Sequence, residues 1–300
     1  MHVTFRQLRL FVALADTGSV TAAARSMHVT QPTASMQLRE IAAAVGLPLY
    51  EVVARKVHLT EAGRQLARTA RAIVDEWERY GQTVAAMRGL TSGRLRVAVV
   101  STAKYFVPRL LGSFCARHPG IEISLEVLNR DGVVQRLRDN LDDLYVMSMP
   151  PTDVDLEDRV FLANPLVMVA PRGHALAGRR RVALRLLEDE RFILRERGSG
   201  TRLATDRFLD AQGFAPARRL ELGSNEAIKE AVAGHLGVAI LSQHALRGTE
   251  PRRDLCVLPV TGLPIRSQWH VVHPRAKQLS PIARVFHAHL LREASEWSVG

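Results

Sequence analysis

A ten-residue run, TQPTASMQLR at positions 30 to 39, carries amide, hydroxyl and guanidinium side chains at helical spacing. The apolar residues of the same stretch step by four, three and four, which lines one helical face: Ala34, Leu38, Ile41 and Val45. The polar residues are left off that face. Glutamine pairs with adenine edges, Ser and Thr reach phosphates or bases, and Arg contacts phosphate or guanine. The pattern predicts a helix that reads DNA in the major groove, and its alternative is an ordinary solvated helix face.

A second set of polar residues lies between predicted strand ends and helix starts. It comprises Ser101 and Thr102, the segment 199–201, and Ser224 with Asn225. Helix N-termini offer unpaired N–H groups and a positive dipole end, so several of them at one cleft bind an anion. Charge could come from Lys104, Arg195, Arg197 and Arg202. Each hydroxyl taken alone is most simply an ordinary helix N-cap, and only the recurrence of the pattern after several strands makes an anion site an equal alternative.

Catalytic and metal-binding patterns are missing from the sequence. It has no Gly-x-Ser-x-Gly elbow, no Walker loop and no His-Glu-x-x-His, and its histidines lack partners at ligand spacing. The two cysteines, Cys115 and Cys256, are far apart in the chain. We therefore expect no enzyme activity, no metal, no cofactor and no disulfide framework.

Length and composition predict a folded protein with more than one domain. The 300 residues are 47% hydrophobic, and the formal net charge is +11, which favours an anionic partner. Residues 1–60 hold +3 of that excess and residues 94–300 hold +7. The first residues lack the apolar core of a signal peptide and no apolar run reaches 18 residues, so we expect a cytosolic protein with no membrane partner.

The elements that position the polar run are three short helices and a basic hairpin within residues 1–60. Phe5, Leu8, Val12 and Ala15 predict the inner face of the first helix. A second helix opens at Ser19. Thr30 is the expected N-cap of the third, which ends before Gly46. Residues 49–59 then predict a two-stranded wing around Arg55 and Lys56. Two helices joined by a short turn and followed by a wing form a winged helix-turn-helix.

A long helix is predicted from Thr60 and Glu61 to about Leu90. Its apolar positions alternate steps of four and three and form a narrow seam: Leu66, Ala70, Ile73, Trp77, Tyr80, Val84 and Met87. Such a seam favours coiled-coil dimerisation. The alternative is that the same face packs on its own domain.

After a break at 91–93 the pattern changes to alternating strands and helices, typical of a parallel α/β sheet. We expect strands at 95–100, 121–128, 144–147, 166–170, 192–194, 219–222, 238–241 and 268–273, and a final helix at 281–295. These elements predict two α/β lobes with a cleft between them.

The residues FRQLRLFVALADTGSVTAAARSMHVTQPTASMQLREI, followed by LTEAG, resemble the winged helix-turn-helix of LysR-type transcriptional regulators. The resemblance continues over nearly the whole chain, through a linker helix and a two-lobed α/β effector domain similar to periplasmic binding proteins. The segments at 101–123, 198–202, 223–242 and 262–269 are most similar to the CbbR-type regulators of Calvin-cycle genes.

This resemblance implies three parts: a DNA-binding domain at residues 1–60, a dimerisation helix and hinge at 61–93, and an effector domain at 94–300. Lobe I would span about 94–163 and 262–300, and lobe II about 164–261. The implied DNA contacts are Thr30, Gln31, Pro32, Thr33, Ser35, Met36, Gln37, Arg39, Arg55 and Lys56. The implied effector contacts are Ser101, Thr102, Lys104, Thr201, Arg202, Ser224 and Asn225.

The implied partners are a partly palindromic stretch of double-stranded promoter DNA, a small anionic effector, a second copy of the chain as a homodimer or homotetramer, and RNA polymerase. The implied role is that of a transcriptional activator. Two other classes stay open. A small-anion-binding protein and a sugar-phosphate enzyme could both use the same α/β scaffold.

Overall fold

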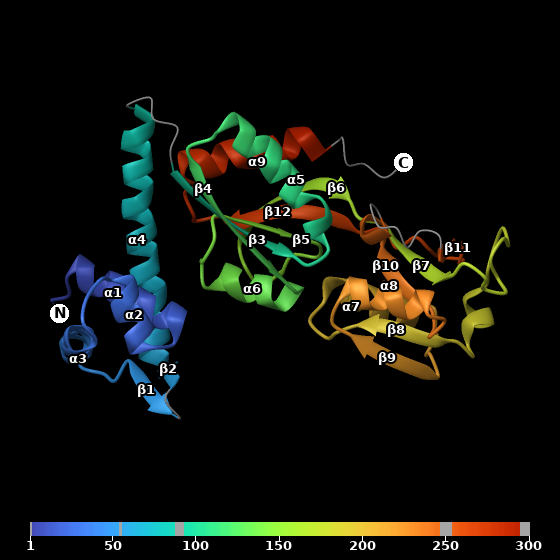
Figure 1. Ribbon diagram of the computed structural model, residues 1–300, viewed down its shortest axis with the longest axis horizontal. Helices are drawn as coiled ribbons and strands as arrows, with labels where there is room; N and C mark the ends of the chain where they lie inside the picture. Colours follow the sequence, from blue (N-terminus) through green and yellow to red (C-terminus); the bar gives the residue numbers. More distant parts are fainter. Residues whose placement is uncertain (1, 54–55, 88–92, 247–253, 295–300) are drawn as a thin grey trace. The chain divides into compact units, whose positions relative to one another are not determined.

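The computed structural model describes residues 2–53, 56–87, 93–246 and 254–294 (Figure 1). The chain divides into two compact units, one of residues 1–90 with 139–141 and the other of residues 91–138 with 142–300. Within the described ranges no helix is both long and apolar enough to cross a membrane.

Three helices form the core of the first unit, α1 (Phe5–Thr17), α2 (Val20–Ser26) and α3 (Gln31–Val45). Their N-caps are the hydroxyls of Thr4, Ser19 and Thr30, each of which accepts a backbone N–H. The predicted inner face of α3 is confirmed, since Ala34, Leu38 and Ile41 are buried.

The predicted inner face of α1 is wrong. Leu10, Phe11 and Leu14 are its buried residues, whereas Phe5 is 37% exposed. The Phe5 ring packs against Trp77 of the long helix, with ring centroids 5.9 Å apart. The helix therefore has two apolar faces, and the sequence alone did not say which of them meets α2 and α3.

The wing and the long helix meet closely. β1 (Tyr50–Val53) pairs antiparallel with β2 (Lys56–Leu59), and α4 (Glu61–Met87) follows. Thr60 donates its hydroxyl to the Pro48 carbonyl at 2.7 Å and its N–H to the Leu49 carbonyl. A Cβ added to Gly63 would lie 1.9 Å from the same Leu49 oxygen. Only glycine permits this approach, so the start of α4 is fixed to the base of the wing.

Lobe I of the second unit is a five-stranded sheet in the order β4-β3-β5-β12-β6. Its strands are β3 (Gly93–Val100), β4 (Ile121–Leu128), β5 (Leu144–Met147), β6 (Leu156–Ala163) and β12 (Gln268–Pro274). The helices α5 (Val107–Arg117) and α9 (Pro281–Glu293) cover one face, and α6 (Arg130–Arg138) covers the other (Figure 1). A short 3-10 turn, Ala103–Tyr105, joins β3 to α5.

Lobe II contains β7 (Leu166–Pro171), β8 (Arg191–Arg195), β9 (Arg218–Leu222), β10 (Ala239–Ser242) and β11 (Leu255–Leu258). The order β10-β7-β11 is extended by β8 and β9 through a bridge from Phe192 to Val238. Alternate residues of β7 enter different cores, Met168 with α7 (Gly200–Ala211) and Val169 with α8 (Asn225–Ala233). Because strand side chains alternate between faces, these two helices lie on opposite sides of the sheet.

The expectation of parallel sheets is partly wrong. β3 pairs parallel with β4 and β5, but β12 pairs antiparallel with β5 and β6, and β7 is antiparallel to both of its neighbours. Two strands, β6 and β11, were not predicted. β6 is an edge strand whose first half is charged, Glu157 to Arg159, and edge strands often carry charged side chains that hide the apolar pattern of a strand.

Candidate nucleic-acid interface and candidate anion site

The N-terminal half of α3 presents a polar outer face to solvent. Gln31, Pro32 and Arg39 are exposed, Met36 is 53% exposed, and Thr33, Ser35 and Gln37 are half-buried. Thr30 caps the helix and its hydroxyl lies 2.8 Å from that of Thr33. Gln31 donates to the Ser35 hydroxyl at 2.9 Å. These side chains form a continuous surface, the geometry by which a recognition helix presents itself to the major groove.

Of the two basic wing residues, Lys56 is exposed at the start of β2. Arg55 lies outside the described residues. A positive side chain at Lys56 suits a phosphate contact, which positions a protein on DNA without reading its sequence.

The seam of α4 divides into two parts. Leu66 packs on the core of its own unit and Ala70 is fully buried, as the alternative interpretation proposed. Further along, Ile73, Trp77 and Tyr80 are 43%, 63% and 61% exposed. The Trp77 and Tyr80 rings lie 5.9 Å apart. Val84 is half-buried, and the Met87 side chain is not described. The outer half of the seam is a bare apolar stripe, which is what an unpartnered dimerisation helix exposes.

In the second unit, the first turn of α7 has no side-chain cap. Ser199 stands at the N-cap position, but its hydroxyl does not bond back to the helix. Ser199 and Thr201 are 4% and 6% exposed, and in lobe I Thr102 and Ser148 are each 5% exposed. Thr102 and Ser148 follow β3 and β5, which are neighbours in the sheet.

These four hydroxyls make no side-chain hydrogen bond within the described ranges, and Gly200 approaches Ser148 so closely that a Cβ would lie 3.1 Å from its Oγ. The first turn of α7 therefore lies against Ser148 at the end of β5, and the end of β3 is joined to lobe II through the bond from Arg195 to Ser101. Uncapped N–H groups beside free hydroxyls are able to bind a phosphate or carboxylate.

Arg195, at the end of β8, is the buried charge beside this site. Its guanidinium pairs with Glu196, donates to Asn225 Oδ1 at 2.7 Å, and donates to Ser101 Oγ of lobe I at 3.0 Å. Arg195 is only 2% exposed. The bond to Ser101 joins the two lobes through one hydrogen bond to a charged donor, which is stronger than a neutral one.

A second link between the lobes centres on Glu226 in the first turn of α8. Lys104 donates to it at 2.9 Å and Tyr105 at 2.7 Å, both from lobe I. Partial burial raises the pKa of Glu226, but these two hydrogen bonds outweigh burial and lower the pKa to about 2. Glu226 is thus charged at neutral pH, and Lys104 is already paired.

Two of the predicted effector residues have other contacts. Arg202 donates to Asp206, to Glu221 and to the carbonyl of Arg195. Ser224 caps α8 by accepting from Ala227. The structure brings Ser101, Asn225 and Lys104 to the links between the lobes and gives Arg202 and Ser224 partners within lobe II.

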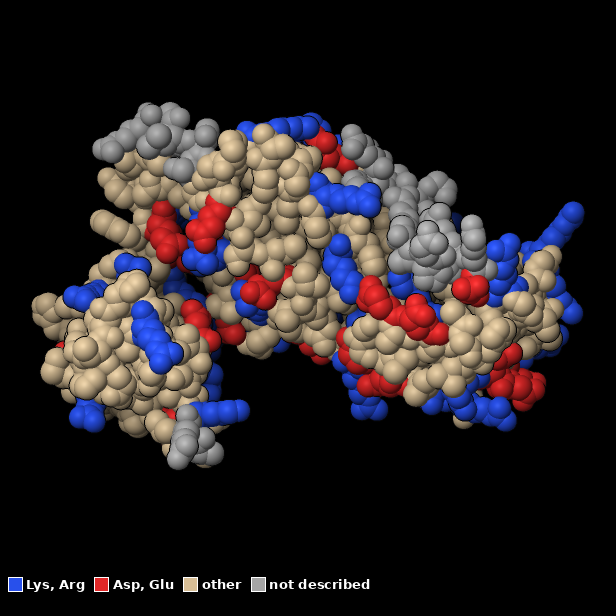
Figure 2. Space-filling view, viewed as in Figure 1, with Lys and Arg blue, Asp and Glu red and all other residues tan. Residues whose placement is uncertain are grey.

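Acidic side chains are interspersed with the Lys and Arg side chains over much of the face shown in Figure 2.

Three residues near the links between the lobes were not predicted from the sequence: Ser148, Tyr105 and Glu226. Ser148 had a usable signal, since it follows a strand just as Ser101 does. Tyr105 and Glu226 lie 121 residues apart in the chain, and no sequence pattern indicated that they would pair.

Comparison with protein-family models gives two matches. "Bacterial regulatory helix-turn-helix protein, lysR family" matches residues 5–64, and "LysR substrate binding domain" matches residues 88–295.

Among curated proteins, the HTH-type transcriptional activator CmpR of Synechocystis is 42% identical, with 95% of this chain and 94% of the relative covered. The RuBisCO operon transcriptional regulator of Allochromatium vinosum is 42% identical over 98% of both chains.

Among solved structures, the regulatory domain of Synechocystis CcmR in complex with 2-PG is 46% identical. It covers 69% of this chain and 100% of its own, with a TM-score of 0.67. A cysteine-to-aspartate variant of full-length OxyR from Pseudomonas aeruginosa is 20% identical with a TM-score of 0.79, over 97% of this chain and 94% of its own. The OxyR likeness shows that this chain shares the fold of full-length OxyR.

Proposed function

The chain belongs to the LysR family of transcriptional regulators, and from this premise we propose that it activates a carbon-fixation operon when a small phosphorylated anion such as 2-phosphoglycolate binds its effector domain. The observation that carries the proposal is the uncapped first turn of α7, where Gly200 lies against the buried Ser148 of lobe I. The CcmR regulatory domain, 46% identical, is described in complex with 2-PG. Curated relatives at 42% identity are named as a transcriptional activator and as a RuBisCO operon regulator.

The anion would bind by its phosphate at the α7 N–H groups and the Thr201 hydroxyl. Thr102, Ser148 and Ser199 would supply further hydrogen bonds. The buried Arg195 next to this turn adds positive potential without giving up its own partners. Because the donors come from both lobes, the bound anion favours one interlobe angle over the others.

DNA would be read by α3, with Gln31, Thr33, Ser35, Met36, Gln37 and Arg39 toward the bases and Thr30, Pro32, Arg55 and Lys56 near the backbone. Two copies joined through Ile73, Trp77 and Tyr80 of α4 would place two α3 helices on a partly palindromic site in double-stranded DNA. The protein would act in the cytosol.

The test is titration of the full-length protein onto the promoter beside its own gene, with and without 2-phosphoglycolate, together with calorimetry of 2-phosphoglycolate binding. Replacing the Thr201 hydroxyl in Thr201→Val should weaken 2-phosphoglycolate about tenfold, because a hydrogen bond to a charged ligand is lost. Thr205→Val is the matched control, one turn further from the N-terminus and equally buried.

A promoter shift that is the same with and without 2-phosphoglycolate, together with no calorimetric heat of 2-phosphoglycolate binding, would contradict the effector assignment. Equal affinities in Thr201→Val and Thr205→Val would contradict the site. No promoter shift at all would contradict the DNA-binding proposal itself.

A further inference from the structure

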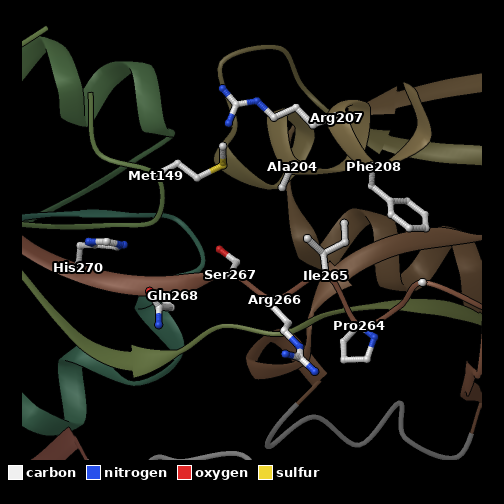
Figure 3. A pocket seen from close by; sticks show the side chains of 11 residues that line it. Met149, Ala204, Arg207, Phe208, Pro264, Ile265, Arg266, Ser267, Gln268 and His270 are labelled. Carbon is white, nitrogen blue, oxygen red and sulfur yellow. The ribbon is translucent and has the colours of Figure 1, made fainter. Parts of the chain in front are cut away.

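A cavity of about 590 Å³ lies beside the middle of α7, away from its N-terminal turn (Figure 3). A volume of this size falls in the range of roughly 300 to 1,000 Å³ found for small-molecule sites. Its lining residues are Met149, Ala204, Arg207, Phe208, Gly262, Pro264, Ile265, Arg266, Ser267, Gln268 and His270. None of the predicted effector residues is among them. We call this cavity the α7 groove.

The floor of the α7 groove is apolar. Ala204 and Phe208 project from α7, and Ile265 and Pro264 lie on the segment that returns the chain to lobe I. Gly262 has a φ of +88°, and a Cβ there would lie 3.0 Å from the Phe208 ring. Glycine is required by both the backbone conformation and the ring contact, so the shape of the floor is specified by the sequence.

Two arginines give the α7 groove a positive charge, and a carboxylate just outside the lining, Asp158, contacts His270 at 2.7 Å. No Asp or Glu lies among the lining residues that are described. Arg207 and Arg266 are exposed, and in the described ranges neither makes an ion pair or a side-chain hydrogen bond. Arg202, earlier on the same helix, pairs with two carboxylates. Figure 3 shows Arg207 extending from α7 toward Met149, with Arg266 on the opposite side of the apolar floor.

Both lobes contribute walls to the α7 groove. Met149 and His270 belong to lobe I, and Arg207 with Phe208 belongs to lobe II. Met149 has a φ of +57°, which is strained for a residue with a side chain. Its carbonyl accepts from Arg130 Nε at 2.8 Å, which holds the strained loop in place. A ligand that contacts both walls binds one interlobe angle better than another.

We propose that the α7 groove is a second ligand site, which takes an organic anion with an apolar body, its phosphate or carboxylate on Arg207 and its body on Phe208 and Ile265. This goes beyond the effector proposed above, because the two ligands occupy different parts of α7 and both bias the same interlobe angle. The small anion at the N-terminal turn needs no apolar surface, whereas the ligand of the groove does.

The experiment measures binding of phenyl phosphate and of inorganic phosphate to the full-length protein by calorimetry. Phenyl phosphate should bind about tenfold more tightly than inorganic phosphate, because its ring covers the apolar floor. Arg207→Gln should weaken phenyl phosphate about tenfold, through loss of a charged hydrogen-bond donor, and leave 2-phosphoglycolate affinity unchanged. Arg218→Gln, at an exposed arginine of β9 outside the groove, is the matched control and should change neither.

Equal phenyl phosphate affinities in the wild type and Arg207→Gln would overturn the proposal. So would complete displacement of phenyl phosphate by 2-phosphoglycolate, since that result means a single shared site. A protein that binds phenyl phosphate through Arg207 but ignores 2-phosphoglycolate would keep the second site and contradict only the effector proposed above.

Discussion

The first turns of α3 and α7 differ in how their backbone N–H groups are satisfied: the first turn of α3 has a side-chain cap, and the first turn of α7 has none. Thr30 closes the first turn of α3 with its own hydroxyl, so this helix interacts through its outward side chains. Ser199 leaves the first turn of α7 open, and the surrounding hydroxyls are buried and unused. A capped helix can read many different surfaces by changing side chains, whereas an uncapped one has a fixed affinity for negative charge.

The largest expected effect tests whether a single α3 helix is sufficient for tight promoter binding when the proposed α4 dimer contact is removed. Ile73→Ala with Trp77→Ala removes most of the exposed stripe on α4. We expect affinity for the two-half-site promoter to fall at least about 100-fold, because a second α3 is then no longer held nearby. Sedimentation measures the oligomeric state, and gel shifts measure the affinity for the promoter. Unchanged oligomeric state and affinity would show that the stripe is not the dimer contact.

Adding a side-chain cap to the first turn of α7 tests whether its free N–H groups bind the effector. Ser199→Asp places a carboxylate where it can bond the first-turn N–H groups of α7. This tethered anion competes with the effector, so 2-phosphoglycolate affinity should fall about 30-fold while the helix becomes more stable. Ser199→Ala, which adds no charge, should cost about threefold in the same calorimetric assay. Equal losses in both variants would mean that the N–H groups do not bind the effector.

Removing one reading side chain from α3 should have a smaller effect. Gln31→Ala should lower affinity for the specific site about tenfold, within the range of one base contact, and leave affinity for random DNA nearly unchanged. Gln65→Ala, at an exposed glutamine of α4, is the control. An equal loss on random DNA would make Gln31 a backbone contact instead.

The smallest expected effect is on stability. Thr30→Ala opens the first turn of α3 and should cost the first unit about 1 kcal/mol in the free energy of unfolding, the usual value of an N-cap. Chemical denaturation followed by Trp77 fluorescence, in a background with Trp269→Phe and Trp297→Phe, measures this free energy. A change below about 0.3 kcal/mol would mean that the Thr30 hydroxyl adds nothing to α3, contrary to its contact with the Thr33 N–H.

Local signals account for what could be predicted. The bounds of β4 and β5 match the prediction at both ends, and α3 is capped by Thr30 and ends before Gly46 as expected. Caps, glycines and compact apolar runs act within a few residues, so a local pattern suffices to predict them. The inner face of α1 could not be predicted, since Phe5 and Leu10 belong to two apolar faces with different partners. β6 could not be predicted because its charged first half, Glu157 to Arg159, looks like a loop.

The site was predictable only where one polar residue marks a strand end. Ser101 and Asn225 were predicted in this way, and the structure shows that Arg195 bonds both, while their role in effector binding stays a prediction. Glu226 bonds Lys104 and Tyr105 across more than a hundred residues. Pairings of that kind depend on the packing of the two lobes and leave no periodic trace in the sequence.

The contact at Gly63 has a mechanical consequence. Because this glycine lies against the Leu49 carbonyl and Thr60 bonds to Pro48, α4 cannot rotate about its own axis without turning the wing with it. A 27-residue α-helix is about 40 Å long and, held in this way, transmits torque. In the proposed dimer, a change in how two α4 helices cross would therefore alter the angle at which Lys56 approaches DNA, because α4 and the wing turn together.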